Sequence, residues 1–197
     1  ALVSVNGLDS MKEQVNMAGH GKSNLDRGIN TLFVDQPGTG EALRKRGLTA
    51  VYDTEKWATP AFDYLASRDD VDASRIGIFG LSLGGYYAPR AAANEPRFAL
   101  CAVMGANHVW GQRQKERMER EGENPVPHYW DHVLWVWGKE NLDDFMAYMP
   151  NGNISSRGEF RAGSSFSVGT SPYSCMSCHY NPEEITYDVI IPQMNKN

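Results

Sequence analysis

The sequence predicts an α/β protein in which helices cover both faces of a mostly parallel sheet. Three observations support this fold class: short apolar segments, helical periodicity between them, and a glycine-rich turn that joins a strand to a helix. Strands that are apolar throughout are typical of parallel sheets buried on both faces. With 197 residues, 41% of them hydrophobic, the chain has the length and apolar content of one α/β domain.

Strands and helices are expected to alternate along the first half of the chain. The helix at 54–67 is indicated by apolar residues such as Trp57 and Leu65 at helical spacing. Ligands of parallel sheets bind beyond the carboxyl ends of the strands, so the loops that follow the strands should meet there. The expected strands are 1–6, 31–35, 75–79 and 98–104, the expected helices are 10–18, 54–67 and 84–94, and the loops are 6–10, 36–40 and 105–108.

The segment from Gly80 to Gly84 reads Gly-Leu-Ser-Leu-Gly and joins the strand at 75–79 to a helix of small residues. A Gly-x-Ser-x-Gly segment in this context predicts a nucleophile elbow, in which the serine stands on a strained turn. The two glycines would make room for the turn, and Ser82 would be raised clear of the sheet as a nucleophile. The backbone N–H of Leu83 would then face a developing oxyanion. The alternative is a glycine-rich turn in an α/β protein of another kind.

Helices inserted after the strand at 98–104 are expected to form a lid over Ser82. A charged segment at 112–123, an aromatic segment at 128–137 and a short segment at 141–149 each have helical character. Their tryptophans and tyrosines either seal the lid to the core or contact substrate, and the sequence leaves both roles open. The candidate substrate contacts are His108, His128, Trp130 and His132.

From about Pro150 the chain loses its periodicity, and only 185–191 reads as a strand. Segments rich in Gly and Ser, such as 155–171, are typical of irregular structure. This tail contains Cys175-Met176-Ser177-Cys178-His179, a C-x-x-C-H pattern of the kind that attaches c-type haem. We interpret the pattern as coincidental, because it occurs once in an irregular segment. Zinc would need a second pair of ligands, so neither a metal nor a cofactor is expected.

Charge and hydropathy narrow the classes of partner. The net charge of −5 provides no basic surface for nucleic acid. No apolar run approaches the roughly 20 residues of a membrane span, and no basic and apolar leader opens the chain. The first residues already read as a buried strand without an initiator Met, which suggests a start inside a longer protein. Three cysteines indicate a reducing, cytoplasmic location, and the sequence is compatible with a homodimer.

Several longer motifs match a known family in their order along the chain. They are the segments 5–13 (VNGLDSMKE), 34–42 (VDQPGTGEA), 80–90 (GLSLGGYYAPR), 105–108 (GANH) and 123–132 (ENPVPHYWDH). By these motifs residues 1–149 resemble the alpha/beta hydrolases, in the group of fermentation-respiration-switch-type esterases and 2,6-dihydroxypseudooxynicotine hydrolase. The resemblance implies an alpha/beta-hydrolase fold with an inserted helical lid. It implies cofactor-free hydrolysis of a small carbonyl compound, with Ser82 as nucleophile and oxyanion donors at Leu83 and at the turn of Leu8 and Asp9.

The resemblance ends near residue 150. A serine nucleophile needs a base that is itself held by a carboxylate, and the family carries both after its lid. Nothing in 150–197 matches those family segments. A shifted reading frame, altered splicing or a truncated gene would explain this loss of similarity. The expected organisation is therefore a hydrolase core at 1–107, a helical lid at 108–149 and an irregular tail at 150–197. Missing family strands would leave an edge of the sheet uncovered.

We therefore expect a serine hydrolase acting on an ester, or on a carbon–carbon bond next to a carbonyl. It would be weak or inactive in this form, because the triad acid and base are not identifiable. One alternative is a non-catalytic pseudo-hydrolase that binds a small ligand or a partner, and labelling of Ser82 by a fluorophosphonate would separate the two. A second alternative is a haem-attached redox protein through Cys175 and Cys178, which would require a Soret band.

Overall fold

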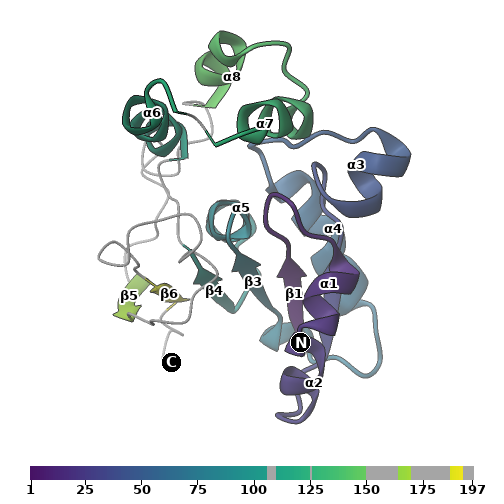
Figure 1. Cartoon of the computed structure of the whole chain (residues 1–197). Helices are drawn as coiled ribbons and strands as arrows, with labels where there is room; N and C mark the ends of the chain where they lie inside the picture. Colours follow the sequence, from purple (N-terminus) through teal and green to yellow (C-terminus); the bar gives the residue numbers. More distant parts are fainter. Residues whose placement is uncertain (106–109, 125, 150–163, 170–186, 193–197) are drawn as a thin grey trace.

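The computed structural model describes residues 1–105, 110–124, 126–149, 164–169 and 187–192 (Figure 1). Six strands within these residues form one sheet in the order β2-β1-β3-β4-β6-β5. The first four are parallel to one another, and β6 pairs antiparallel with both β4 and β5, so the mostly parallel sheet expected from the sequence is confirmed. The strands are β1 (Leu2–Val5), β2 (Thr31–Val34), β3 (Gly77–Leu81), β4 (Leu100–Met104), β5 (Ser164–Gly169) and β6 (Tyr187–Pro192).

Helices pack on both faces of the parallel strands. The described helices are α1 (Lys12–Met17), α2 (His20–Leu25), α3 (Gly40–Arg46), α4 (Glu55–Ala66), α5 (Gly84–Asn94), α6 (Trp110–Glu121), α7 (Tyr129–Trp137) and α8 (Leu142–Tyr148). Phe79 and Gly80 are neighbours in β3, so they face opposite sides of the sheet. The ring of Phe79 lies 5.9 Å from the ring of His20 in α2. A Cβ added to Gly80 would lie 2.9 Å from the Cβ of Ala88 in α5, on the other side.

Two of the short helices do not coincide with elements expected from the sequence. The expected helix at 10–18 forms as α1, but the chain then turns at Gly19, with φ +90°, and begins α2. Helix α3 begins at Gly40, the last residue of the expected turn at 36–40. Neither helix carries an apolar stripe of several residues, since α2 has no buried residue and α3 buries only Gly40 and Leu43. Periodicity is therefore too weak to reveal them.

Two strands lie inside the tail that was expected to be irregular apart from 185–191. Strand β6 confirms the expected strand, shifted by two residues at its start and one at its end. Strand β5 was missed because serines occupy half of its positions, and the run carries little hydrophobic signal. Strand β6 pairs with β4 through Cys101↔Ile190 and Ala102↔Val189. The free edge of β4 is thereby covered, and the expectation of an uncovered edge at this strand is wrong.

Helices α6, α7 and α8 lie beyond the carboxyl ends of β1 and β3 (Figure 1). Apolar side chains of α7 and α8 join the same core as the sheet, with Val133 and Val136 fully buried and Trp137 only 2% exposed. A backbone hydrogen bond of 2.8 Å from Ala50 N to Val136 O also ties α7 to the first half of the chain. Across the described ranges, no helix combines the length and the apolar character needed to cross a membrane.

Candidate functional site

Ser82 lies at the turn from β3 to α5 with a backbone conformation that side-chain-bearing residues rarely adopt. Its φ is +56°, and the only other described non-glycine residue with positive φ is His128. The turn is held by hydrogen bonds of 2.7 Å from Ser82 N to Met104 O and from Gly85 N to Ser82 O. A strained residue that the surrounding structure holds in place is typical of functional sites. Ser82 is half-buried, so its hydroxyl is not sealed in the core.

Gly80 and Gly84 are required by the close approach of the chain on both sides of Ser82. A Cβ on Gly80 would lie 2.0 Å from the carbonyl oxygen of Gly84. A Cβ on Gly84 would lie 2.8 Å from the carbonyl oxygen of Val5 and 3.0 Å from that of Asn6. These contacts are with backbone atoms that cannot rotate away, so neither position accepts a side chain. The expected cramped geometry around Ser82 is therefore present.

The loop between β1 and α1, residues 6–11, lies beside Ser82. A Cβ on Gly7 would lie 3.0 Å from the Cβ and 3.4 Å from the Oγ of Ser82. The N–H of Gly7 already donates to Ser10 Oγ at 2.9 Å. Within the part of the chain that is described, the backbone N–H groups of Leu8, Asp9 and Leu83 donate to no acceptor. The β1–α1 loop and the start of α5 thus bring unengaged N–H groups to the neighbourhood of the serine.

Asp35, at the carboxyl end of β2, is the best-satisfied carboxylate near this loop. Its side chain is 6% exposed and accepts from the backbone N–H and the ammonium of Lys12, both at 2.8 Å. Its oxygens also accept from Asn6 Nδ2 at 3.1 Å and Glu41 N at 3.0 Å. Burial raises the pKa of Asp35, but the hydrogen bonds from Lys12 and Glu41 outweigh burial and leave the pKa below its ordinary value.

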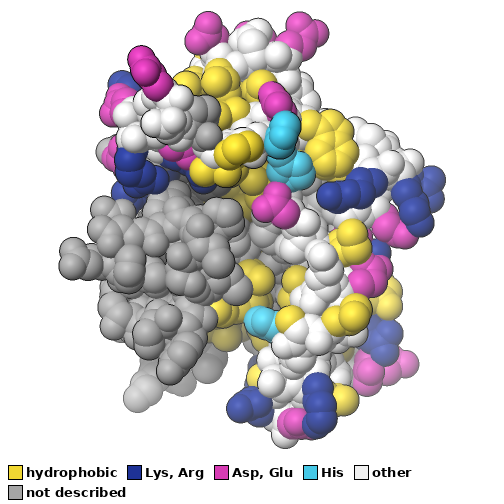
Figure 2. Space-filling view, in the orientation of Figure 1, with side chains coloured by type: hydrophobic (Ala, Val, Ile, Leu, Met, Phe, Trp, Pro, Cys, Tyr) yellow, Lys and Arg dark blue, Asp and Glu magenta, His cyan; other side chains and the backbone are white. Residues whose placement is uncertain are grey.

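His132 of α7 contacts the β1–α1 loop through Asp9. Its Nε2 lies 2.7 Å from Asp9 Oδ1, an ion-pair distance, although the approach lacks the geometry of a hydrogen bond. The imidazole also packs on the ring of Trp135, with centroids 5.5 Å apart. Figure 2 shows histidine, acidic and apolar side chains side by side over α7. Of the expected substrate contacts that the structure describes, His132 is therefore the one tied to this loop.

The other expected contacts are placed differently. The side chain of His128 is 90% exposed and lies 3.9 Å from Asp131. The indole of Trp130 donates to Glu121 Oε2 at 3.1 Å, which joins α7 to α6. His108 lies outside the described residues, as do Cys175, Cys178 and His179. Among the described histidines none is hydrogen-bonded to Ser82, and the triad base and acid are not identified within these ranges.

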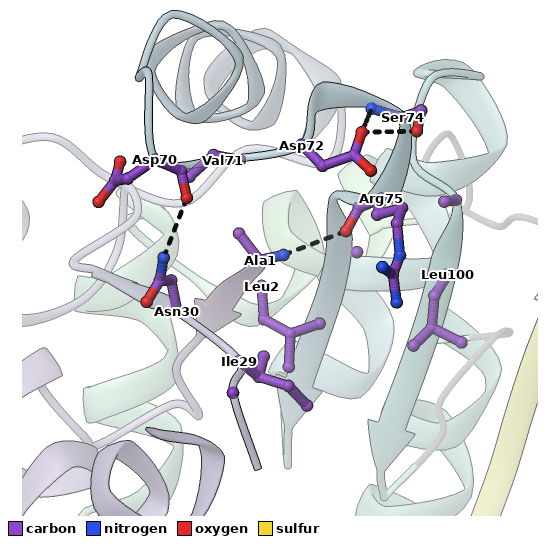
Figure 3. A pocket seen from close by; sticks show the side chains of 13 residues that line it. Ala1, Leu2, Ile29, Asn30, Asp70, Val71, Asp72, Ser74, Arg75 and Leu100 are labelled. Atoms are coloured by element: carbon purple, nitrogen blue, oxygen red, sulfur yellow. Dashed lines mark hydrogen bonds between the residues drawn. The ribbon is translucent and has the colours of Figure 1, made fainter. Parts of the chain in front are cut away.

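A cavity of about 550 Å³ opens at the other end of the sheet. It is lined by Leu2, Gly77 and Leu100, at or near the amino ends of β1, β3 and β4, and by polar side chains from the segment 70–75 (Figure 3). Ser82 follows the carboxyl end of β3, so this cavity is not part of the candidate site. No group of three or more His, Cys, Asp or Glu side chains in the described ranges is arranged to hold a metal ion.

Several known proteins similar to this chain are named as hydrolases. It is 36% identical over 109 residues to 2,6-dihydropseudooxynicotine hydrolase of Paenarthrobacter nicotinovorans, covering 53% of this chain and 28% of that protein. It is 38% identical over 109 residues to the hydrolase acrC of Aspergillus aculeatus, covering 53% of this chain and 25% of that protein. The solved structure of 2,6-dihydroxy-pseudo-oxynicotine hydrolase matches with a TM-score of 0.66 and 27% identity, over 80% of this chain and 41% of that one.

These matches cover only part of each relative. The chain spans about a quarter of the length of these two curated relatives, and no protein-family model matches it. The structure of AbyA5 matches with a TM-score of 0.62 at 24% identity, which supports the fold alone. The fold and these relatives confirm the resemblance drawn from the sequence motifs. Together they show that this chain has the alpha/beta-hydrolase fold and that 2,6-dihydropseudooxynicotine hydrolase is one of its relatives.

Proposed function

We propose that this chain carries the nucleophile and the oxyanion site of a serine hydrolase that acts on small carbonyl compounds. The observation that carries the proposal is the positive φ of Ser82 on a turn surrounded by unengaged N–H groups. In the proposed reaction, Ser82 Oγ bonds to the substrate carbonyl carbon and loses its proton to a base. The carbonyl oxygen becomes an oxyanion, the leaving group departs with a proton, and water then releases the acyl group from the serine.

The proposed oxyanion donors are the backbone N–H groups of Leu83, Leu8 and Asp9. Fixed N–H groups stabilise a developing negative charge because they need no reorientation, and one such donor contributes about 3 kcal/mol to lowering the barrier. The Gly7 N–H is excluded as a donor, since it is bonded to Ser10. This chemistry requires no cofactor. The substrate class that fits is an ester, or a ketone whose neighbouring carbon–carbon bond is cleaved.

Helices α6–α8 are proposed to form a lid over this site, as expected for residues 108–149. Their place beyond the carboxyl ends of β1 and β3 (Figure 1) and the contact of His132 with Asp9 support the assignment. His132 is then the best-placed substrate contact among the expected residues that the structure describes. A buried free thiol at Cys101 fits a reducing compartment, and we propose the cytoplasm as the location.

Covalent labelling with a fluorophosphonate tests the nucleophile without requiring full turnover. Attack by Ser82 Oγ forms an oxygen–phosphorus bond and expels fluoride. We expect adduct on the peptide that contains Ser82, detected by mass spectrometry, and no adduct in Ser82→Ala. Ser23→Ala, at an exposed site in α2, is the matched control and should label like the wild type. Because no described histidine is bonded to Ser82, labelling should be slow compared with a serine hydrolase that has a complete triad.

Failure of the wild type to label at Ser82 would contradict the proposal and would favour a non-catalytic protein that binds a small ligand. Labelling that persists in Ser82→Ala would show that another residue is the reactive group. Hydrolysis of short-chain aryl esters, followed by release of the phenol, measures any residual turnover. That activity should be lost in Ser82→Ala and retained in Ser23→Ala.

A further inference from the structure

The side-chain amide of Gln36 is hydrogen-bonded to both the backbone N–H and the backbone carbonyl of Asn6. Asn6 N donates to Gln36 Oε1 at 3.2 Å, and Gln36 Nε2 donates to Asn6 O at 2.9 Å. Gln36 is 2% exposed and Asn6 is fully buried, so water does not compete for these bonds. Gln36 therefore fixes the first residue of the β1–α1 loop, directly after β1 ends.

Asp35 fixes both ends of the same loop. Its Oδ1 accepts from the side chain of Asn6 and from the backbone N–H of Lys12, which follows the loop. Its Oδ2 accepts from the ammonium of Lys12 and from Glu41 N in α3. Hydrogen bonds to a charged acceptor are roughly twice as strong as neutral ones. A single buried carboxylate thus joins the entrance and the exit of the β1–α1 loop to the end of β2.

The residues between these anchors include Leu8 and Asp9, the proposed oxyanion donors. The loop is also packed against the start of α5, because a Cβ on Gly84 would lie 3.0 Å from Asn6 O. Displacing Asn6 or Lys12 would therefore move the two N–H groups relative to Ser82. Oxyanion donors must lie within hydrogen-bonding distance of the reacting oxygen, so shifts of the order of an ångström matter.

We infer that Asp35 and Gln36 are positioning residues, which hold the β1–α1 loop so that its N–H groups face the oxygen bound at Ser82. Neither residue touches the substrate in this assignment, and both act through the backbone of the loop. The catalytic part of the inference rests on the proposed function. The structural part, that Asp35 orders the loop, does not depend on whether Ser82 reacts.

Asp35→Asn is the most informative variant because it keeps the size of the side chain. Each oxygen of Asp35 accepts two hydrogen bonds, so the amide nitrogen would face two donors in either orientation. The matched control is Asp26→Asn, which removes an exposed carboxylate that directly follows α2 and is bound by Lys22. Both variants change the net charge by one, and only the first should affect the loop.

Two measurements test the inference. The rate of fluorophosphonate labelling at increasing probe concentration separates the maximal rate from the half-saturating concentration. We expect the maximal rate of Asp35→Asn to fall roughly 10- to 100-fold, with little change in the half-saturating concentration. The ³¹P chemical shift of the Ser82 adduct should also move, since it reports the donors around the phosphoryl oxygen. Amide hydrogen exchange should increase in residues 6–12, while the control variant behaves as the wild type.

The outcomes separate this inference from the proposed function. If the wild type does not label, the proposed function fails, and hydrogen exchange of residues 6–12 alone decides whether Asp35 orders the loop. Unchanged exchange and unchanged maximal rate in Asp35→Asn would overturn the inference. If Asp35→Asn does not fold, Lys12→Met replaces it, because this variant removes one donor at a partly exposed position. Lys12→Met should change the labelling rate and the hydrogen exchange in the same direction but by smaller amounts. Wild-type behaviour of Lys12→Met would also contradict the inference.

Discussion

The positive φ of Ser82 restricts which residues can occupy the neighbouring positions. With φ at +56°, the chain reverses within a few residues and brings the carbonyl of Gly84 against Gly80. Each non-glycine residue held in such a conformation costs on the order of 1–3 kcal/mol, which the surrounding packing must offset. The glycines therefore belong to the site as much as the serine does.

Gly80→Ala should destabilise the protein by about 3 kcal/mol, because the new Cβ would lie 2.0 Å from a backbone oxygen. Gly47→Ala is the comparison. Gly47 has φ +65° but nothing within 4 Å of an added Cβ, so only the backbone cost of about 1 kcal/mol applies. Urea unfolding monitored by circular dichroism measures both free energies of unfolding. Equal losses in the two variants would contradict the close approach at Gly80.

The lowered pKa of Glu95, at the end of α5, predicts that the protein loses stability in acid. Hydrogen bonds from Arg97 lower the pKa of Glu95 to about 2, aided by a bond from Thr59. A depressed folded-state pKa adds stability above the ordinary value of 4.5, and this stability is lost as the pH falls from there towards 2. Glu95→Gln should therefore cost about 1.5–3 kcal/mol near pH 7 and flatten the decline in stability below pH 4.5.

Free energies of unfolding measured from pH 7 to pH 3 test this assignment. Thr59→Val removes one donor to Glu95 and should reduce the decline only in part. A decline in Glu95→Gln as steep as that of the wild type would assign the acid sensitivity to other groups.

At the level of elements, α7 anchors helices α6–α8 to the core. Trp137 is 2% exposed and packs against the rings of Tyr87, Phe145 and Tyr148. Trp135, two residues earlier, is 46% exposed and lies beside His132. Helical geometry places these two tryptophans on different faces of α7, so one segment provides a matched pair for testing its attachment.

Trp137→Ala should lower the free energy of unfolding by about 3–5 kcal/mol, because it leaves a large cavity between α7, α8 and α5. Trp135→Ala should change it by less than about 1 kcal/mol, since nearly half of the residue is exposed and it lies outside the buried cluster. Urea unfolding of the two variants beside the wild type gives both values. Similar losses in the two variants would place the anchor of α7 elsewhere.

The sequence predicts the elements whose pattern is strong and misses those whose pattern is weak. The four parallel strands and α4, α5 and α7 follow from apolar runs, helical periodicity and the glycine-rich turn. Helix α2 buries no residue, and half of the positions in β5 are serines, so neither element has a strong hydrophobic signal of its own. Such elements form because tertiary contacts support them, and those contacts are not local in the sequence.

The candidate site also combines features that sequence motifs predict with contacts that they do not predict. Ser82 as nucleophile and the N–H groups of Leu83, Leu8 and Asp9 as oxyanion donors are predictions from sequence motifs and the family resemblance. The contact of Asp9 with His132 spans more than 120 residues, and the bonds of Asp35 and Gln36 to Asn6 span about 30. The only hint in the sequence is that Asp35 ends the expected strand at 31–35 and Gln36 begins the expected loop at 36–40, with no role assigned to either side chain. Only the parallel pairing of β1 with β2 brings these side chains together.

At the scale of the whole molecule, one hydrophobic core joins the sheet to the helices beyond it. Val3 and Ile78 from the sheet belong to the same buried cluster as Tyr87 of α5, Val136 of α7 and Phe145 of α8. Removing α6–α8 would expose part of this cluster, so these helices should not come away without loss of the core. We therefore expect the described residues before 150 to unfold together.

Two optical probes test this cooperativity because they report different parts of the molecule. Four of the five tryptophans, Trp110, Trp130, Trp135 and Trp137, lie in α6 and α7, so tryptophan fluorescence follows these helices. Far-ultraviolet circular dichroism follows all helices. In urea the two transitions should coincide in midpoint and slope, since a single cooperative unit gives the same curve for every probe. A fluorescence transition at clearly lower urea would mean that α6–α8 separate from the sheet first, as a lid with its own weaker attachment would do.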